Sequence, residues 1–188
     1  MRRENGVLSR DEVRKILSFL EGPRWLMGSL IYGAGLGSVE CVRLRVKDVD
    51  FARNRIRVRS KDGDVAGFTC LPPAAKVPLR QYLSQVKQIH ERDLSEGFGR
   101  VYLPVTLEVQ YPGANAEWGW QYVFPASRRS KDPRSGVVRR HHIHVTVPRR
   151  AVREAARKAG VDGPVSCRSL LEASVAHRLE DGKIKQPD

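Results

Sequence analysis

The chain has 188 residues, of which 40% are hydrophobic, and a net charge of +13. This length and apolar content exclude a chain that is disordered throughout, and the lack of any run of about 18 uncharged apolar residues excludes a membrane span. No apolar run follows the first residues, MRRENG, and the three cysteines lack the spacing of a metal or redox site, so we expect a soluble protein of a reducing cytoplasm.

Three helices are predicted in the first 45 residues. Ser9 and Glu12 have the spacing of a capping box, which predicts a helix over 11–22. A second, mostly buried helix is expected over 23–35, and a third, short helix over 38–45.

A small antiparallel sheet is predicted next. Residues 49–60 contain two runs typical of strands around a hairpin tip at Arg53-Asn54, and residues 67–72 are expected to add a third strand. A long helix is predicted over 73–97. Residues 99–136 are richer in Gly, Pro and aromatic residues, which indicates an irregular or only partly helical segment.

Two further helices complete the pattern. Residues 147–160 have Pro148 in the first turn and Gly160 at the end, which are the positions that these two residue types favour. The last helix is expected over 169–182. Helices around a small antiparallel sheet place the chain in the α+β class.

Positive charge is concentrated in one segment. Between Arg128 and Lys158, eleven lysines and arginines stand against two acidic residues, Asp132 and Glu154. A solvated helix face is one explanation for such a run. A surface that binds the phosphates of a nucleic acid is the explanation that we favour.

Two stretches resemble a known family. Residues 30–60, LIYGAGLGSVECVRLRVKDVDFARNRIRVRS, resemble the opening of the tyrosine recombinase catalytic domain, and EWGWQYVFP, DPRSG and RRHH, between residues 117 and 142, are similar to integron integrases. The resemblance covers residues 7–182. It implies a single, mainly helical tyrosine-recombinase-like catalytic domain over 1–188, with an integron-integrase-type insert over 99–144. It also implies that the family's N-terminal core-binding domain and C-terminal tyrosine segment lie outside this chain.

The family cuts DNA without metal or cofactor. A tyrosine attacks the phosphate, two arginines stabilise the crowded anion that forms, a lysine on the β-hairpin assists the leaving oxygen, and histidines contribute. Integron integrases also bind a folded single strand whose unpaired bases project from a stem. The resemblance therefore implies DNA as the partner.

The positions of the family's catalytic residues carry other side chains here. Gly37 stands where the first arginine is expected, and Arg168, Leu171 and Glu172 stand in place of the His-x-x-Arg-His cluster. Glycine and leucine offer no charge to a phosphate, and a carboxylate repels it. Lys61 is the candidate for the hairpin lysine, and an ordinary solvated turn lysine is the alternative.

No tyrosine of this chain occupies the nucleophile's place. All five tyrosines precede the position that the family uses and are expected to be core or partly buried aromatics. Loss of a single anion-stabilising donor typically costs about 10²–10³ in rate. We therefore expect the chain not to cut DNA.

The residues that contact extrahelical bases are retained. The resemblance assigns this role to Trp120, Pro133, His141 and His142, because flat rings stack on an unpaired base. Neighbouring phosphates are expected to bind arginines of the same segment, namely Arg128, Arg129, Arg139 and Arg140.

Each of these assignments has an alternative. Trp120 is otherwise a core aromatic, with Trp118 or Tyr122 in the stacking role. His141, His142 and His144 are otherwise surface histidines or, less in keeping with their adjacency and the lack of Cys or acidic residues at ligand spacing, metal ligands.

The sequence thus predicts a DNA-binding integron integrase-like protein that is catalytically inactive. One alternative is a fragment of an active recombinase that is completed in trans. Another is an interaction protein that associates with itself or with a complete integrase and disturbs its assembly. RNA binding through charge alone is a further alternative.

Overall fold

The computed structural model describes residues 6–60, 62–133 and 135–182. The chain divides into two compact units. We call them the helical unit, Met1–Cys41 with Val145–Asp188, and the mixed unit, Val42–His144. The predicted insert, 99–144, lies entirely within the mixed unit, and its assignment to one catalytic domain stays a prediction.

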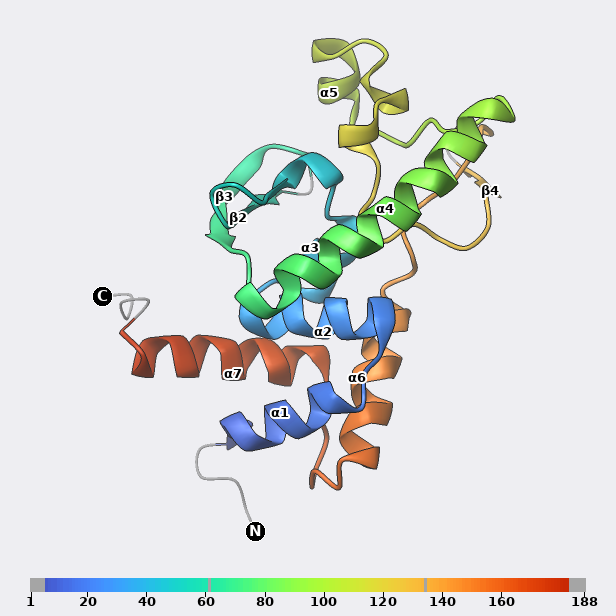
Figure 1. The fold of residues 1–188 in the computed structure, drawn as a ribbon. Coiled ribbons are helices and arrows are strands. Elements are labelled where there is room, and N and C mark those ends of the chain that lie inside the picture. The colour runs from blue at the N-terminus through green and yellow to red at the C-terminus, as the bar shows by residue number, and fades with distance from the viewer. Residues whose placement is uncertain (1–5, 61, 134, 183–188) are drawn as a thin grey trace. The chain divides into compact units, whose positions relative to one another are not determined.

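The helical unit contains α1 (Arg10–Ser18), α2 (Gly22–Gly33), α6 (Thr146–Lys158) and α7 (Cys167–Glu180), and α3 (Ser38–Arg43) carries the chain from it into the mixed unit. In Figure 1 these helices are labelled, and α2 packs against both α6 and α7. Apolar side chains that recur along α2 fill the core of this unit: Leu26, Met27, Leu30 and Ile31.

Local sequence signals explain where these helices begin and how closely they pack. The capping box at α1 is confirmed, since the backbone N–H of Glu12 donates to Ser9 Oγ at 3.2 Å and that of Ser9 to Glu12 Oε2 at 2.8 Å. A Cβ at Gly28 of α2 would lie 2.7 Å from Cδ1 of Leu20. Only glycine therefore allows this approach of the two segments.

The mixed unit is built on a three-stranded antiparallel sheet in the order β1 (Val49–Asp50), β2 (Arg55–Arg59), β3 (Val65–Cys70). Asn54, at the hairpin tip between β1 and β2, has a φ of 51°, a left-handed conformation that asparagine tolerates. Residue Arg57 of β2 pairs with Phe68 of β3, and a bulge between Val58 and Arg59 shifts the register.

The sheet is followed by α4 (Pro73–Ser95), by α5 (Val105–Gln110) and by two short 3-10 helices, Ala114–Ala116 and Trp118–Trp120. A second, two-stranded sheet pairs β4 (Ser130–Lys131) with β5 (Val138–Arg139). A buried cluster joins α5 to the 3-10 helices: Val101, Leu103, Leu107, Ala114, Trp120 and Tyr122.

The predicted α+β class is confirmed, as are the helices and the three-stranded sheet. The first helix ends at Ser18 rather than at residue 22, because the chain turns at Phe19. The pairing of β4 with β5 was not predicted. Two-residue strands are too short to show an alternating pattern in the sequence.

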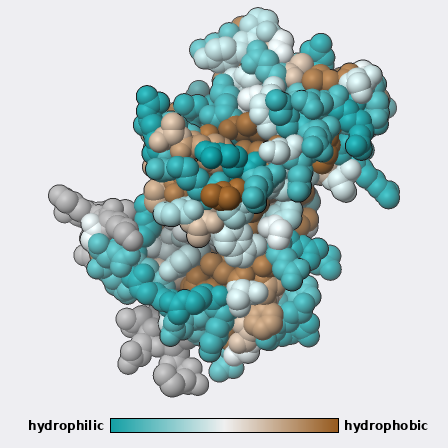
Figure 2. All heavy atoms as spheres, in the orientation of Figure 1, coloured by the Kyte–Doolittle hydropathy of each residue, from teal (hydrophilic) through white to brown (hydrophobic). Residues whose placement is uncertain are grey.

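The molecular surface is largely hydrophilic on the face drawn in Figure 2. None of the described helices combines the length and the apolar character that crossing a membrane requires.

Candidate nucleic-acid interface

Gly37, to which the resemblance assigns the position of the family's first arginine, lies in the helical unit directly before α3. The backbone N–H of Gly37 donates to Oε2 of Glu40 at 2.7 Å. A Cβ at Gly37 would stand 3.3 Å from the same oxygen. Gly37 therefore offers no cation to a phosphate, and its backbone N–H is already hydrogen-bonded to the carboxylate of Glu40.

The second catalytic position lies on the first turns of α7. This helix begins with Ser166, which accepts a hydrogen bond from the backbone N–H of Ser169. The exposed Arg168 donates from Nε to Oε1 of Glu172 at 2.8 Å, and this hydrogen bond raises the pKa of Arg168. Leu171, which lies between these two residues in the sequence, is half-buried. An ion pair thus occupies the turn where the resemblance implies phosphate-binding residues. Lys61 lies outside the described residues.

Trp120 is a core residue of this structure, and the base-stacking role that the resemblance implies for its ring stays a prediction. Its exposed fraction is 4%, and its ring lies 5.7 Å from that of Tyr111. The Nζ of Lys47 is 3.2 Å from the ring centroid of Trp120, and burial lowers the pKa of this lysine. The indole therefore supports the packing of the mixed unit and offers no open face in this conformation.

The two aromatic alternatives differ from each other. Tyr122 is buried, and the guanidinium of Arg45 lies 3.8 Å from its ring centroid. Trp118 is only half-buried and stacks on His90, with 5.9 Å between the ring centroids. Of the three aromatic residues considered from the sequence, Trp118 has the most accessible ring.

Arg140 is held inside the mixed unit. It donates from Nε and Nη2 to the two carboxylate oxygens of Asp93 at 2.5 and 2.8 Å, and from Nη1 to the carbonyls of Ala126 and Ser127. These hydrogen bonds raise the pKa of Arg140. Its donors are therefore engaged with protein in this structure, and the phosphate contact expected of Arg140 stays a prediction.

Two other arginines of the predicted set are also engaged. Arg129 binds Glu96 at 2.7 Å and lies over the ring of Phe98 at 4.0 Å. Arg139 donates from Nη1 to the carbonyl of Val101 at 2.8 Å. Arg128 is exposed and forms no ion pair with the part of the chain that the structure describes. It alone of the four predicted arginines has the accessibility that a phosphate contact requires.

The adjacent histidines have different surroundings. Burial lowers the pKa of His142, whose ring meets the edge of Tyr122 at 5.0 Å and whose Nδ1 lies 2.7 Å from the carbonyl of Ile143. His141 Nε2 lies 4.0 Å from Oδ2 of the buried Asp132, next to the exposed Pro133. His141 and Pro133 thus remain at the surface, whereas His142 is partly covered.

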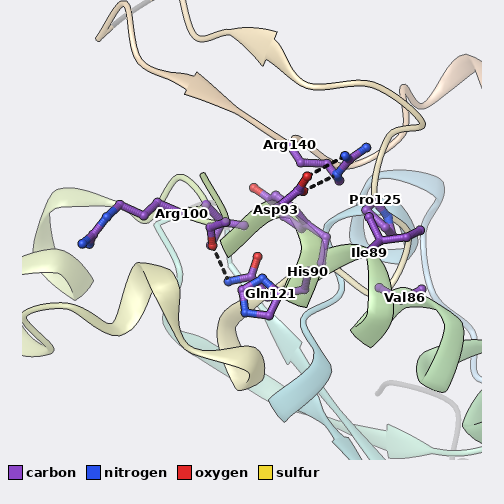
Figure 3. Close-up of a pocket in the computed structure, with 11 residues that line it drawn as sticks. Val86, Ile89, His90, Asp93, Arg100, Gln121, Pro125 and Arg140 are labelled. Carbon is purple, nitrogen blue, oxygen red and sulfur yellow. Dashed lines mark hydrogen bonds and ion pairs between the residues drawn. The ribbon is translucent and has the colours of Figure 1, made fainter. Parts of the chain in front are cut away.

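The pocket drawn in Figure 3 is lined in part by the same ion pair, Asp93 and Arg140. Residues of α4, among them His90 and Asp93, line it together with Gln121 and Arg140. The Nε2 of Gln121 donates toward the carbonyls of Gly99, Asn115 and Glu117, so the amide nitrogen is engaged with backbone. The pocket is a small gap inside a polar network. Among residues 6–60, 62–133 and 135–182, no cluster of three His, Cys, Asp or Glu residues has the geometry of a metal site.

The most accessible row of positive charge lies on α6. Arg149, Arg153 and Arg157 follow one another at intervals of four residues, which places them along one face of the helix. All three are exposed, and none forms an ion pair with another described residue. The opposite face is buried through Ala151, Val152, Ala155 and Ala156. These arginines belong to the basic segment between Arg128 and Lys158, and their four-residue spacing is visible in the sequence, but no role was predicted for them individually.

No protein-family model matches the chain. The chain is 40% identical over 176 residues to a protein of Escherichia coli named integrase/recombinase, and the match covers 94% of this chain and 52% of that protein. A protein of the same name from Pseudomonas aeruginosa matches with the same values. The chain therefore spans about half the length of the curated relatives that it matches.

Two further matches involve XerA. The tyrosine recombinase XerA of Thermococcus onnurineus (strain NA1) is 38% identical over 79 residues, which cover 40% of this chain and 28% of that protein. A crystal structure of XerA recombinase matches with a TM-score of 0.63 and 20% identity, over 94% of this chain and 50% of that chain. At such identity this last match shows the fold.

Proposed function

We propose that this chain, which belongs to the tyrosine recombinase family, is an integron integrase-like protein that binds DNA without cutting it. The observation that carries DNA binding is the row of exposed arginines on α6. Successive side chains on such a face stand about 6 Å apart, which is close to the spacing of phosphates along a strand. The bacterial cytoplasm, where such DNA lies, is the proposed place of action.

The lack of cleavage is supported by the two catalytic positions. Gly37 has no cation to place against a phosphate, and its amide is held by Glu40. Arg168 is paired with Glu172, whose carboxylate would repel the anion that forms during strand exchange. Leu171 supplies no donor. These three features remove the electrostatic stabilisation on which the chemistry depends.

The integron-like preference is supported by residues that keep both their identity and their accessibility. Pro133 is exposed, His141 is half-buried, and Arg128, which belongs to the same basic segment, is exposed. A half-buried imidazole still presents part of its flat face to a base that has left a stem. We propose that these residues, with His142 as support beneath them, contact extrahelical bases.

The test is a salt titration of binding to three DNAs of equal length, followed by fluorescence anisotropy. They are a perfect duplex, a hairpin with extrahelical bases and the same hairpin without them. We expect all three to bind at low salt and the bulged hairpin to keep its advantage at high salt, since stacking is not screened. Lack of binding to any DNA would overturn the proposed function. If the three DNAs bind with equal affinity at each salt concentration, charge is the only basis of recognition.

A nicked suicide substrate tests the lack of cleavage. We expect no covalent protein–DNA product from the unmodified chain, or from the chain mixed with a synthetic segment that supplies a tyrosine. A covalent product in the mixture alone would favour the alternative of a fragment completed in trans.

A second candidate function is association with another recombinase molecule. Val105 and Val109 stand one turn apart on α5, with exposed fractions of 72% and 75%, and form an apolar stripe on a short helix. Exposed apolar groups of this kind favour a protein partner. Val109→Asp should then abolish any inhibition of an active integrase by this chain, while DNA binding through α6 stays unchanged.

A further inference from the structure

The two faces of strand β2 differ in character. Ile56 is fully buried, whereas Arg55, Arg57 and Arg59 alternate with it and lie on the other face. The pairing of β2 with β3 places Phe68 directly opposite Arg57. The outer face of this hairpin, which is labelled β2 and β3 in Figure 1, therefore combines three arginines with one aromatic ring.

Phe68 is an exposed aromatic residue, with an exposed fraction of 54%. The guanidinium carbons of Arg55 and Arg57 lie 4.6 and 5.9 Å from its ring centroid. A phenylalanine in this position adds little to the core, and its exposed ring is costly in water. The arrangement is a flat apolar ring bordered by cations, which is the composition of platforms that bind single-stranded nucleic acid.

The three arginines are not equivalent. Arg59 is locked in place, because its Nε donates to both oxygens of the buried Asp48 at 2.8 and 2.9 Å and its Nη1 donates to the carbonyl of Gly63 at 2.6 Å. The shortest ion-pair contacts of Arg55 and Arg57 are longer, at 3.5 Å to Asp50 and 3.7 Å to Asp48.

Neither of these two guanidiniums forms a side-chain hydrogen bond within the described ranges. Donors that are close to a carboxylate but not bonded to it can turn toward a phosphate at small cost. Arg59 therefore anchors the hairpin, while Arg55 and Arg57 keep donors that a ligand can use.

We propose that Phe68, with Arg55 and Arg57, forms a stacking site for an unpaired base of single-stranded DNA. The ring would stack on the base, and the two arginines would hold the phosphates on either side of it. A base in a duplex has both faces covered by its neighbours, so the site selects unpaired nucleotides. The inference rests on the proposed DNA-binding function but uses a different surface from α6 and from the histidines.

The test compares three variants of the full chain by fluorescence anisotropy. Phe68→Ala removes the ring, Phe68→Trp keeps a stacking surface, and Phe19→Ala removes a phenylalanine of the helical unit with a similar exposed fraction, 49%. The probes are a labelled 12-nucleotide oligothymidylate, an abasic strand of the same length, and a duplex of the same length. Circular dichroism melting shows that each variant is folded.

We expect Phe68→Ala to weaken oligothymidylate binding about fivefold or more, which corresponds to the loss of one stacked base. Binding of the abasic strand and of the duplex should be unchanged. Phe68→Trp should restore or exceed the original affinity, and Phe19→Ala should have no effect on any probe.

Two results would contradict the inference in different ways. If the original chain binds the duplex and Phe68→Ala leaves oligothymidylate binding unchanged, the stacking site is wrong and the proposed function stands. If Phe68→Ala weakens the abasic strand as much as oligothymidylate, the hairpin binds phosphates without stacking. A chain that binds none of the probes would refute the proposed function itself.

Discussion

Arg168 and Glu172 form an ion pair across one turn of α7, with 2.8 Å between Nε and Oε1. Both side chains are exposed, so the pair adds little to the stability of the helix. We expect its effect to be on DNA binding, because it neutralises a cation at a position where the resemblance implies a phosphate contact.

Glu172→Gln should strengthen DNA binding. The substitution releases the guanidinium of Arg168 and removes a negative charge, so the dependence of log Kd on log salt should steepen by about one phosphate contact. The midpoint of urea unfolding should stay the same. Glu91→Gln, which removes the same charge from an i,i+4 pair on α4, is the control. An equal gain in both variants would mean that only net charge matters.

Arg153→Ala should weaken binding to every DNA by a similar factor. Arg153 is the centre of the exposed row on α6, and a phosphate contact carries no sequence information. The salt slope should decrease by about one. Arg14→Ala on α1 removes another exposed arginine, one that is already paired with Asp11, and should leave the slope unchanged. A loss confined to one DNA sequence would argue for base contacts instead.

Trp120→Ala should destabilise the mixed unit by about 3–5 kcal/mol, the usual cost of truncating a large buried aromatic residue. Trp118→Ala should cost clearly less because its ring is only half-buried. Urea unfolding followed by circular dichroism measures both. A stable Trp120→Ala variant with reduced affinity for the bulged hairpin would restore the base-stacking role that the resemblance implied.

The stability of the mixed unit should fall in weak acid because of His142. Burial lowers the pKa of His142 below its ordinary value of 6.5, so the unfolded chain binds this proton more readily than the folded one. The stabilisation is complete above pH 6.5 and is lost as the pH falls from 6.5 toward the lower folded pKa.

Urea unfolding at pH 7.5 and pH 5.5 tests this dependence. His142→Phe keeps a ring against Tyr122 and removes the titration, so the difference between the two conditions should shrink. It should not vanish, since burial also lowers the pKa of His90. His144→Gln is the control and should behave as the original chain does. An unchanged difference in His142→Phe would show that other groups cause the loss.

The secondary structure was determined largely by the sequence itself. The capping box at Ser9, Pro148 in the first turn of α6 and the turn at Asn54 act over a few residues, so their consequences are readable in order along the chain. The residues at the positions that the resemblance assigns to catalysis were equally readable, because a glycine at position 37 is seen without a structure.

The tertiary structure decided which cations and rings are accessible. Arg140 meets Asp93, which is 47 residues earlier in the chain, and Trp120 is buried against residues that a sequence pattern does not bring together. Phe68 stays exposed, and the guanidiniums of Arg55 and Arg57 from the neighbouring strand lie against its ring. A ligand can bind only to hydrogen-bond donors and side-chain surfaces that are not already engaged within the folded protein. Long-range contacts determine which of them are engaged.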